Sequence, residues 1–225
     1  MTSPKRETLM HPGAVGSFEV LIDHPSEPVA QALIIHPHPR LGGSARHKVP
    51  HAIARALAAS QITCWRPNLP HAGALEGRHD GNGCELDELC QLLNTMHRLH
   101  EDLPIVVVGF SFGAHLAAHL SCRQSQSVAI ADFLLCGLPV GNVMDQRHYE
   151  TPLVPGAYVV HGEADESVPL RQVLEWAAPQ GNAVTVVPQA DHFFTGNLST
   201  LTRLLVERAL QKVWSLPMSP PISGS

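Results

Sequence analysis

A serine stands between two glycines in the segment Gly109-Phe110-Ser111-Phe112-Gly113, directly after the strand-like residues 104–108. The helix-compatible residues 114–122 follow it. In a sharp strand–turn–helix connection of this kind, the serine adopts a strained backbone conformation that exposes its Oγ above the sheet. Side chains two residues to either side would collide with the neighbouring strand and helix, so both places require glycine. The pattern predicts that Ser111 is a nucleophile.

A serine hydroxyl is a weak nucleophile at neutral pH, so it needs a general base, and the base needs an orienting acid. After a turn of this kind, the acid and then the histidine follow the serine along the chain. Residues 161–169 leave a predicted strand and supply Asp165 as the acid, with Glu163 as its main competitor. Residues 188–194 leave the next strand and supply His192 as the base. Both would lie at the carboxyl end of the sheet, where open α/β sheets place their sites.

Each of these residues also has a structural interpretation. The serine could simply form a turn, and Asp165 could cap the helix that begins after Pro169. The chain has 15 histidines, most of which we expect to be structural or exposed. The agreement in chain order among Ser111, Asp165 and His192 favours the catalytic interpretation.

An oxyanion hole needs two backbone N–H groups directed at the developing negative charge. The residue after the nucleophile, Phe112, is expected to supply one of them. The other is expected from residues 36–43, the loop after an early strand. Its two prolines have no N–H to donate, which leaves His38 or Arg40, and we favour His38.

Strand-like and helix-like segments alternate along most of the chain. This alternation predicts an α/β fold with a mostly parallel, twisted sheet and helices on both faces. Residues 18–22 are expected to add an antiparallel edge strand. We predict a single domain over residues 1–216 and a disordered, proline- and serine-rich tail over residues 217–225. The predicted strands are 30–36, 62–68, 104–108, 132–136, 157–161 and 183–187, and the predicted helices are 46–60, 85–98, 114–122, 170–178 and 198–213.

Composition excludes several classes of function. The chain has 225 residues, 44% of them apolar and 16% charged, as in an ordinary globular protein. A net charge of −5 and an aromatic content of 5% argue against a nucleic-acid partner. No apolar run approaches a membrane span, no signal peptide is visible, and the five cysteines form no CxxC pair. We therefore expect a cytoplasmic protein without a membrane or nucleic-acid partner.

Together the motifs resemble those of a bacterial family of small, lidless α/β-hydrolases, predicted esterases related to the dienelactone hydrolases. The matching segments are His-Pro-His-Pro-x-x-Gly-Gly at residues 36–43, Gly-Phe-Ser-Phe-Gly at 109–113, Gly-Glu-Ala-Asp at 162–165 and Asp-His-Phe-Phe at 191–194. The resemblance covers roughly residues 16 to 213. It implies the α/β-hydrolase fold, a Ser111–Asp165–His192 triad and no metal or organic cofactor. One departure is the loop at residues 68–77, where the family's arginine is missing and His71 is added.

These observations predict a serine hydrolase, a carboxylesterase acting on small or short-acyl esters. Thioesters, lactones and peptides are alternatives, since the same triad serves all of them. A binding module with a vestigial site is an alternative from another class, and a metal site among His36, His38, His47 and His51 is a third. We expect only a short loop between residues 136 and 157, no cap domain, and an open, shallow site with little apolar wall. The sequence leaves room for a homo-oligomer.

Overall fold

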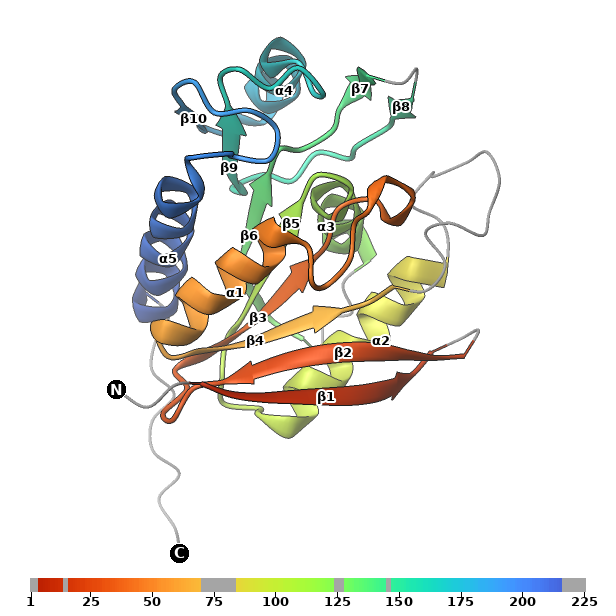
Figure 1. Ribbon diagram of the computed structural model, residues 1–225, viewed down its shortest axis with the longest axis vertical. Helices are drawn as coiled ribbons and strands as arrows, with labels where there is room; N and C mark the ends of the chain where they lie inside the picture. Colours follow the sequence, from red (N-terminus) through yellow and green to blue (C-terminus); the bar gives the residue numbers. More distant parts are fainter. Residues whose placement is uncertain (1–3, 14–15, 70–83, 124–127, 145–146, 216–225) are drawn as a thin grey trace, which may run out of the picture.

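The protein is built around one eight-stranded sheet. The computed structural model describes residues 4–13, 16–69, 84–123, 128–144 and 147–215. The strand order is β1-β2-β4-β3-β5-β6-β9-β10, and the sheet twists through the molecule (Figure 1). The strands are β1 (Lys5–Pro12), β2 (Ser17–His24), β3 (Ala30–Ile35), β4 (Ile62–Pro67), β5 (Ile105–Phe110), β6 (Ile130–Cys136), β9 (Tyr158–Gly162) and β10 (Val184–Val187).

From β4 to β10 all neighbouring strands in the sheet are parallel, while β2 pairs antiparallel with β4 and with β1. The predicted α/β fold with a mostly parallel sheet is therefore confirmed. The prediction of an edge strand at residues 18–22 was wrong in its position. That segment lies in β2, and β1, which the sequence did not reveal, forms the edge.

Helices cover both faces of the sheet. The helices α1 (Lys48–Ala59) and α5 (Leu198–Ser215) pack together on one face. On the other lie α2 (Cys84–Leu99), α3 (Phe112–Arg123) and α4 (Leu170–Ala177). Alternate strand residues serve the two cores, because successive side chains of a strand point to opposite faces. In β3, Leu33 and Ile35 join the core under α2 and α3, while Ala32 and Ile34 join the core under α1 and α5.

The segment between β6 and β9 is more than the expected short loop. It contains a two-stranded antiparallel hairpin, β7 (Gly141–Asn142) and β8 (His148–Tyr149), which forms a separate small sheet. Figure 1 shows this hairpin beside α4, beyond the end of the main sheet. The hairpin is too small to be a helical cap domain, so no described segment between β6 and β9 forms a lid over the sheet's carboxyl edge.

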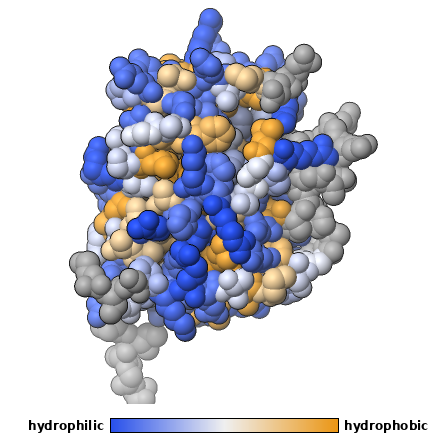
Figure 2. Space-filling model, in the orientation of Figure 1, coloured by the Kyte–Doolittle hydropathy of each residue, from blue (hydrophilic) through white to orange (hydrophobic). Residues whose placement is uncertain are grey.

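The face of the protein seen in Figure 2 is mostly polar. On the face seen in Figure 2, apolar residues lie in several small groups with hydrophilic residues between them. In the parts of the chain that the structure describes, no helix is both long and apolar enough to cross a membrane. The glycine-rich loop from residue 70 to 83 and the predicted tail lie outside the described residues. The cytoplasmic location and the oligomeric state stay predictions.

Candidate active site

Ser111 lies in the turn between β5 and α3, in the left-handed backbone region with φ of 55°. Its carbonyl oxygen accepts the N–H groups of Ala114 and His115, which begins the helix directly after the turn. A Cβ at Gly109 would overlap the backbone of Ala114 in α3, and a Cβ at Gly113 would overlap the backbone of Ile35 in β3. The two glycines therefore permit the close approach of strand and helix that the motif predicted.

The structure brings Ser111, His192 and Asp165 together in one hydrogen-bonded chain. His192 Nδ1 lies 2.7 Å from Asp165 Oδ2, and His192 Nε2 lies 2.8 Å from Ser111 Oγ. Because a carboxylate only accepts, Nδ1 is the donor to Asp165, and Nε2 accepts the serine hydroxyl. The three residues follow β5, β9 and β10 at the carboxyl edge of the sheet. Asp165 and His192 are buried, while Ser111 is half-buried.

The Asp165 carboxylate is held from both sides. Its Oδ1 accepts the N–H groups of Ser167 at 2.9 Å and Val168 at 2.8 Å, while Oδ2 faces His192. Asp165 does not cap α4, whose N-cap is Pro169; instead one of its oxygens orders the preceding turn and the other meets the histidine. The competitor Glu163 points away, because its carboxylate accepts the N–H of Gln189 on the exposed side.

Sequence reasoning missed His161, a fully buried histidine at the end of β9. Its Nε2 lies 3.0 Å from the carbonyl of Val168 and 3.5 Å from Asp165 Oδ2. Burial lowers the pKa of His161, and the Asp165 carboxylate opposes that shift. The ring is therefore neutral, with its Nε2 proton directed at the loop that carries Asp165. A histidine in an otherwise apolar strand was the signal for it in the sequence.

The loop after β3 approaches the start of α3 from the opposite side. The rings of His38 and Phe112 are 4.8 Å apart, so the two residues expected to form the oxyanion hole are neighbours. The N–H of Arg40 donates to His38 Nδ1 at 3.1 Å, within a 3₁₀ turn at Pro39–Leu41. The N–H of Arg40 is thus engaged by the turn, which favours His38 between the two alternatives.

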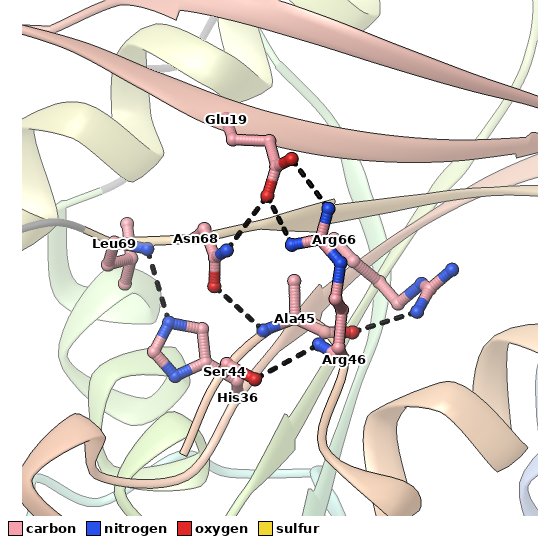
Figure 3. A network of polar contacts seen from close by, with 8 residues as sticks. All are labelled: Glu19, His36, Ser44, Ala45, Arg46, Arg66, Asn68 and Leu69. Carbon is pink, nitrogen blue, oxygen red and sulfur yellow. Dashed lines mark hydrogen bonds and ion pairs between the residues drawn. The ribbon is translucent and has the colours of Figure 1, made fainter. Parts of the chain in front are cut away.

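A network of polar contacts fixes this loop to the sheet (Figure 3). Asn68 accepts the N–H of Ala45 at 2.9 Å and donates to Glu19 at 2.9 Å. Glu19 in turn forms a bidentate ion pair with Arg46. The buried Arg66 donates to the carbonyl of Ala45 at 2.8 Å. Residues 45 and 46 are therefore anchored to both β2 and β4.

Another anchor lies at the beginning of the same loop. The buried His36 ring donates from Nδ1 to the carbonyl of Pro37 at 2.7 Å, and its Nε2 accepts the N–H of Leu69 at 3.2 Å (Figure 3). Burial lowers the pKa of His36, which keeps the ring neutral and able to accept.

Among the described residues, no group of three or more histidine, cysteine or acidic side chains is placed to hold a metal ion.

A pocket of about 90 Å³ opens beside Ser111 and His192. The hairpin between β6 and β9 forms one of its walls with Val143, Met144 and Tyr149. The expectation of a shallow site with little apolar wall was therefore wrong. Sequence reasoning missed these residues because strands of two residues carry no periodic pattern.

Phe193 and His47 lie at the rim next to His192. The Phe193 ring is 5.2 Å from that of His192 and 5.6 Å from that of His47. Lys48 Nζ lies 5.2 Å from the centre of the Phe193 ring. Burial, Lys48 and His192 all lower the pKa of His47. A neutral His47 adds no positive charge beside the histidine of the site.

Solved structures with the same architecture also share sequence with this chain. A lidless α/β serine hydrolase from Xanthomonas campestris is 26% identical, with a TM-score of 0.77 over 98% of this chain and 99% of that one. An α/β serine hydrolase homologue from Coxiella burnetii is 29% identical, with a TM-score of 0.75 over 90% of this chain and 96% of that one. By structural similarity, the chain belongs with the lidless α/β serine hydrolases.

Further comparisons agree with this family. The chain also shares its fold with a dienelactone hydrolase from Anabaena variabilis, at 14% identity and a TM-score of 0.72, and with an esterase domain from Rhodothermus marinus, at 19% identity and a TM-score of 0.67. An uncharacterised protein of Rickettsia prowazekii is 26% identical over 180 residues, which are 76% of this chain and 73% of that protein. No protein-family model matches the chain. The resemblance seen in the four sequence motifs is thus confirmed for family and fold.

Proposed function

We propose that this protein is a serine hydrolase that cleaves small carboxylic esters with short acyl groups. The observation that carries the proposal is the continuous hydrogen-bonded chain from Ser111 Oγ through His192 to Asp165, with heavy-atom distances of 2.8 and 2.7 Å. Both distances lie within the reach that proton transfer requires. The Xanthomonas relative, described as a serine hydrolase without a lid, supports the same reaction class.

In the proposed reaction, Ser111 Oγ attacks the ester carbonyl while His192 Nε2 accepts the hydroxyl proton. Asp165 holds the ring so that Nε2 faces the serine, and stabilises the imidazolium that forms. His192 then returns the proton to the leaving alcohol, which leaves an acyl group on Ser111. A water molecule, deprotonated by His192, hydrolyses this acyl-enzyme and restores the serine.

The negative charge on the tetrahedral intermediate needs donors that are already in place. We assign this task to the backbone N–H groups of Phe112 and His38. Phe112 begins α3 directly after the nucleophile, and the polar network at residues 45, 46 and 68 fixes the loop that carries His38. The contact between the His38 and Phe112 rings, at 4.8 Å, keeps the two backbone segments side by side.

The size of the pocket supports short acyl groups. It holds about 90 Å³, so a long chain would extend past the rim into water. Each methylene left in water forgoes about 0.8 kcal/mol of burial. We expect kcat/KM to stop rising with acyl length after a few carbons. A continued rise out to long chains would contradict this part of the proposal.

Hydrolysis of p-nitrophenyl acetate and butyrate by the purified protein tests the proposal, with Ser111→Ala measured alongside. Loss of turnover in the variant, together with loss of labelling by a fluorophosphonate, is the expected result. Equal turnover by both proteins would overturn the assignment of Ser111. Absence of both turnover and labelling in the natural protein would favour the binding-module alternative.

A further inference from the structure

The pocket beside Ser111 contains a full positive charge, and no described residue that lines it carries a negative one. Arg147 lines the pocket together with Ser111 and His192. Among the described residues that line it, none is an aspartate or a glutamate. In the described part of the chain, Arg147 also takes part in no ion pair. The guanidinium group is permanently charged and has five N–H donors, so it favours an anionic partner.

Arg147 is held in place by the hairpin that carries it. Its carbonyl oxygen accepts the N–H of Val143 at 3.0 Å across the hairpin. Its side chain donates to the phenol oxygen of the buried Tyr149, a contact that opposes the upward shift that burial gives the pKa of Tyr149. This hydrogen bond to a neutral oxygen orients the guanidinium, and no described carboxylate pairs with its charge. The Arg147 side chain is half-buried, so this charge is less screened by water than at the open surface.

The hairpin is itself attached to the part of the fold that carries Asp165. The N–H of Met144 donates to the carbonyl of Ser167 at 3.0 Å, two residues after Asp165. On the other side of the hairpin, the Gln172 side chain in α4 donates to the carbonyl of Asn142 at 2.7 Å. These contacts fix the wall that carries Arg147 relative to the reacting groups.

Near the pocket, Lys48 adds a positive charge, which is partly offset by Asp191, a carboxylate whose pKa Lys48 helps to lower. Lys48 lies over the Phe193 ring, on the α1 side of the rim. The Asp165 carboxylate is buried and accepts hydrogen bonds from His192 and two backbone N–H groups. It keeps its negative charge but does not line the pocket, and His192 lies between it and Ser111. Among the described residues that line the pocket, Arg147 is the permanently charged one that an anionic group would meet.

We propose that the pocket selects esters that carry a carboxylate on the acyl side, and that Arg147 binds this carboxylate. The inference rests on the proposed ester hydrolysis and names its substrate class, a half-ester of a short dicarboxylic acid. Arginine matches a carboxylate through two parallel N–H donors, which fixes orientation as well as affinity. The apolar side chains of Val143 and Met144 would contact the methylenes between the two carboxyl groups.

The test compares monomethyl succinate with methyl succinamate, which has the same shape but a neutral amide in place of the carboxylate. Acid release in a pH-stat gives kcat/KM for each ester. A hydrogen bond to a charged group corresponds to about a tenfold preference or more. We expect the natural protein to show this preference for monomethyl succinate over methyl succinamate. The preference should become smaller at high salt and should disappear in Arg147→Gln.

Two variants serve as controls for loss of charge. Arg203→Gln removes a charge on the exposed face of α5, where the residue pairs with Glu207, and should keep the preference. Lys48→Gln removes the charge at the rim and should keep most of it. If Lys48→Gln and Arg147→Gln reduce the preference equally, the general potential is responsible and the inference is overturned. Equal losses on both esters in Arg147→Gln would also overturn it.

Binding to Ser111→Ala separates this inference from the proposed function. Calorimetric titration should show that Ser111→Ala binds monomethyl succinate more tightly than methyl succinamate, and that adding Arg147→Gln removes the difference. If this binding difference is observed but the natural protein hydrolyses no ester, ester hydrolysis is rejected and the anion site is kept. Turnover of p-nitrophenyl acetate without any preference for the carboxylate would reject the anion site and keep ester hydrolysis.

Discussion

The side-chain oxygen of Asn68 accepts the backbone N–H of Ala45 at 2.9 Å, which ties the loop after β3 to the end of β4. The same amide donates to Glu19 in β2. This loop carries His38, whose N–H we assign to the oxyanion hole. We therefore expect the position of this proposed oxyanion donor to depend on Asn68, at the end of the strand next to β3.

We predict that Asn68→Ala lowers kcat more than it raises KM. Loss of the Ala45 contact frees the loop, and a displacement of about 1 Å at a catalytic group can reduce the rate by about a hundredfold. The free energy of unfolding should fall by about 1 kcal/mol. Steady-state kinetics and urea unfolding measure the two effects. Ser44→Ala, which removes only an exposed contact to the Arg46 N–H, is the control and should change neither.

Single and combined substitutions of Ser111, Asp165 and His192 should give losses that do not add. Each of Ser111→Ala and His192→Ala should lower kcat by about 10⁴ or more, and Asp165→Asn by about 10⁴. The triple variant should have a kcat no lower than that of the least active single variant, because the three groups act as one unit. Single-turnover assays measure these losses. Multiplying losses would show that the residues act independently.

Gly113→Ala should destabilise the fold and abolish activity. The added methyl group would overlap the backbone of Ile35 in β3, and backbone cannot move aside as a flexible side chain can. We expect a loss of about 3 kcal/mol or more in unfolding free energy. The control is Gly181→Ala, at φ of 67° with open space around it, where conformational strain alone contributes about 1–2 kcal/mol. Equal losses in the two variants would contradict the steric explanation.

His161 is predicted to position Asp165 without touching the substrate. Its Nε2 proton is directed at Val168 O and Asp165 Oδ2. His161→Phe should lower kcat by about ten- to a hundredfold while KM changes little, because the aspartate loop loses its support. His161→Gln keeps an N–H donor and should recover part of the rate. If His161→Phe had the same kcat as the natural protein, His161 would not have this positioning role.

The contribution of Glu88 to the stability of the protein should fall as the pH rises from 5 to 7. Glu88 in α2 is fully buried, and neither of its carboxylate oxygens has a hydrogen-bond partner among the described residues. Burial, with help from Glu85 and Asp87, raises its pKa to about 7. Between the pKa of the unfolded chain and this value, the folded state holds a proton that the unfolded state has released, so stability declines across that window.

Thermal unfolding of Glu88→Gln at several pH values measures this effect. The variant should unfold at a higher temperature than the natural protein at pH 8, and the difference should shrink toward pH 5. Glu101→Gln, at an exposed position after α2, is the matched control. A difference that stays constant with pH would rule out titration of Glu88 as its source.

Much of the fold could be predicted because its main strands are continuous apolar runs. β3, β4 and β5 are buried along their whole length, and each ends close to its predicted residue. β1 lies on the edge of the sheet and is mostly exposed, so it lacks the apolar alternation that reveals a strand. The hairpin strands β7 and β8 are two residues long and depend on contacts with distant loops.

The positions of Ser111, Asp165 and His192 were accessible from the sequence because each follows a recognisable strand. Parallel strands bring their carboxyl ends to one edge, so chain order alone places the three residues near one another. The environment of these residues was not accessible in that way. His161 and Arg147 gain their importance from neighbours that lie in other segments of the chain, and no local pattern encodes such contacts.

The hairpin between β6 and β9 also bears on how this protein could diversify. The reacting residues sit on the sheet, while an entire pocket wall is supplied by one excursion that leaves the sheet and returns. Replacing that excursion would leave the pairing of β6 with β9 intact. Natural variation or laboratory libraries could therefore alter substrate choice in one stretch of about twenty residues, while the sequence around Ser111, Asp165 and His192 stays the same.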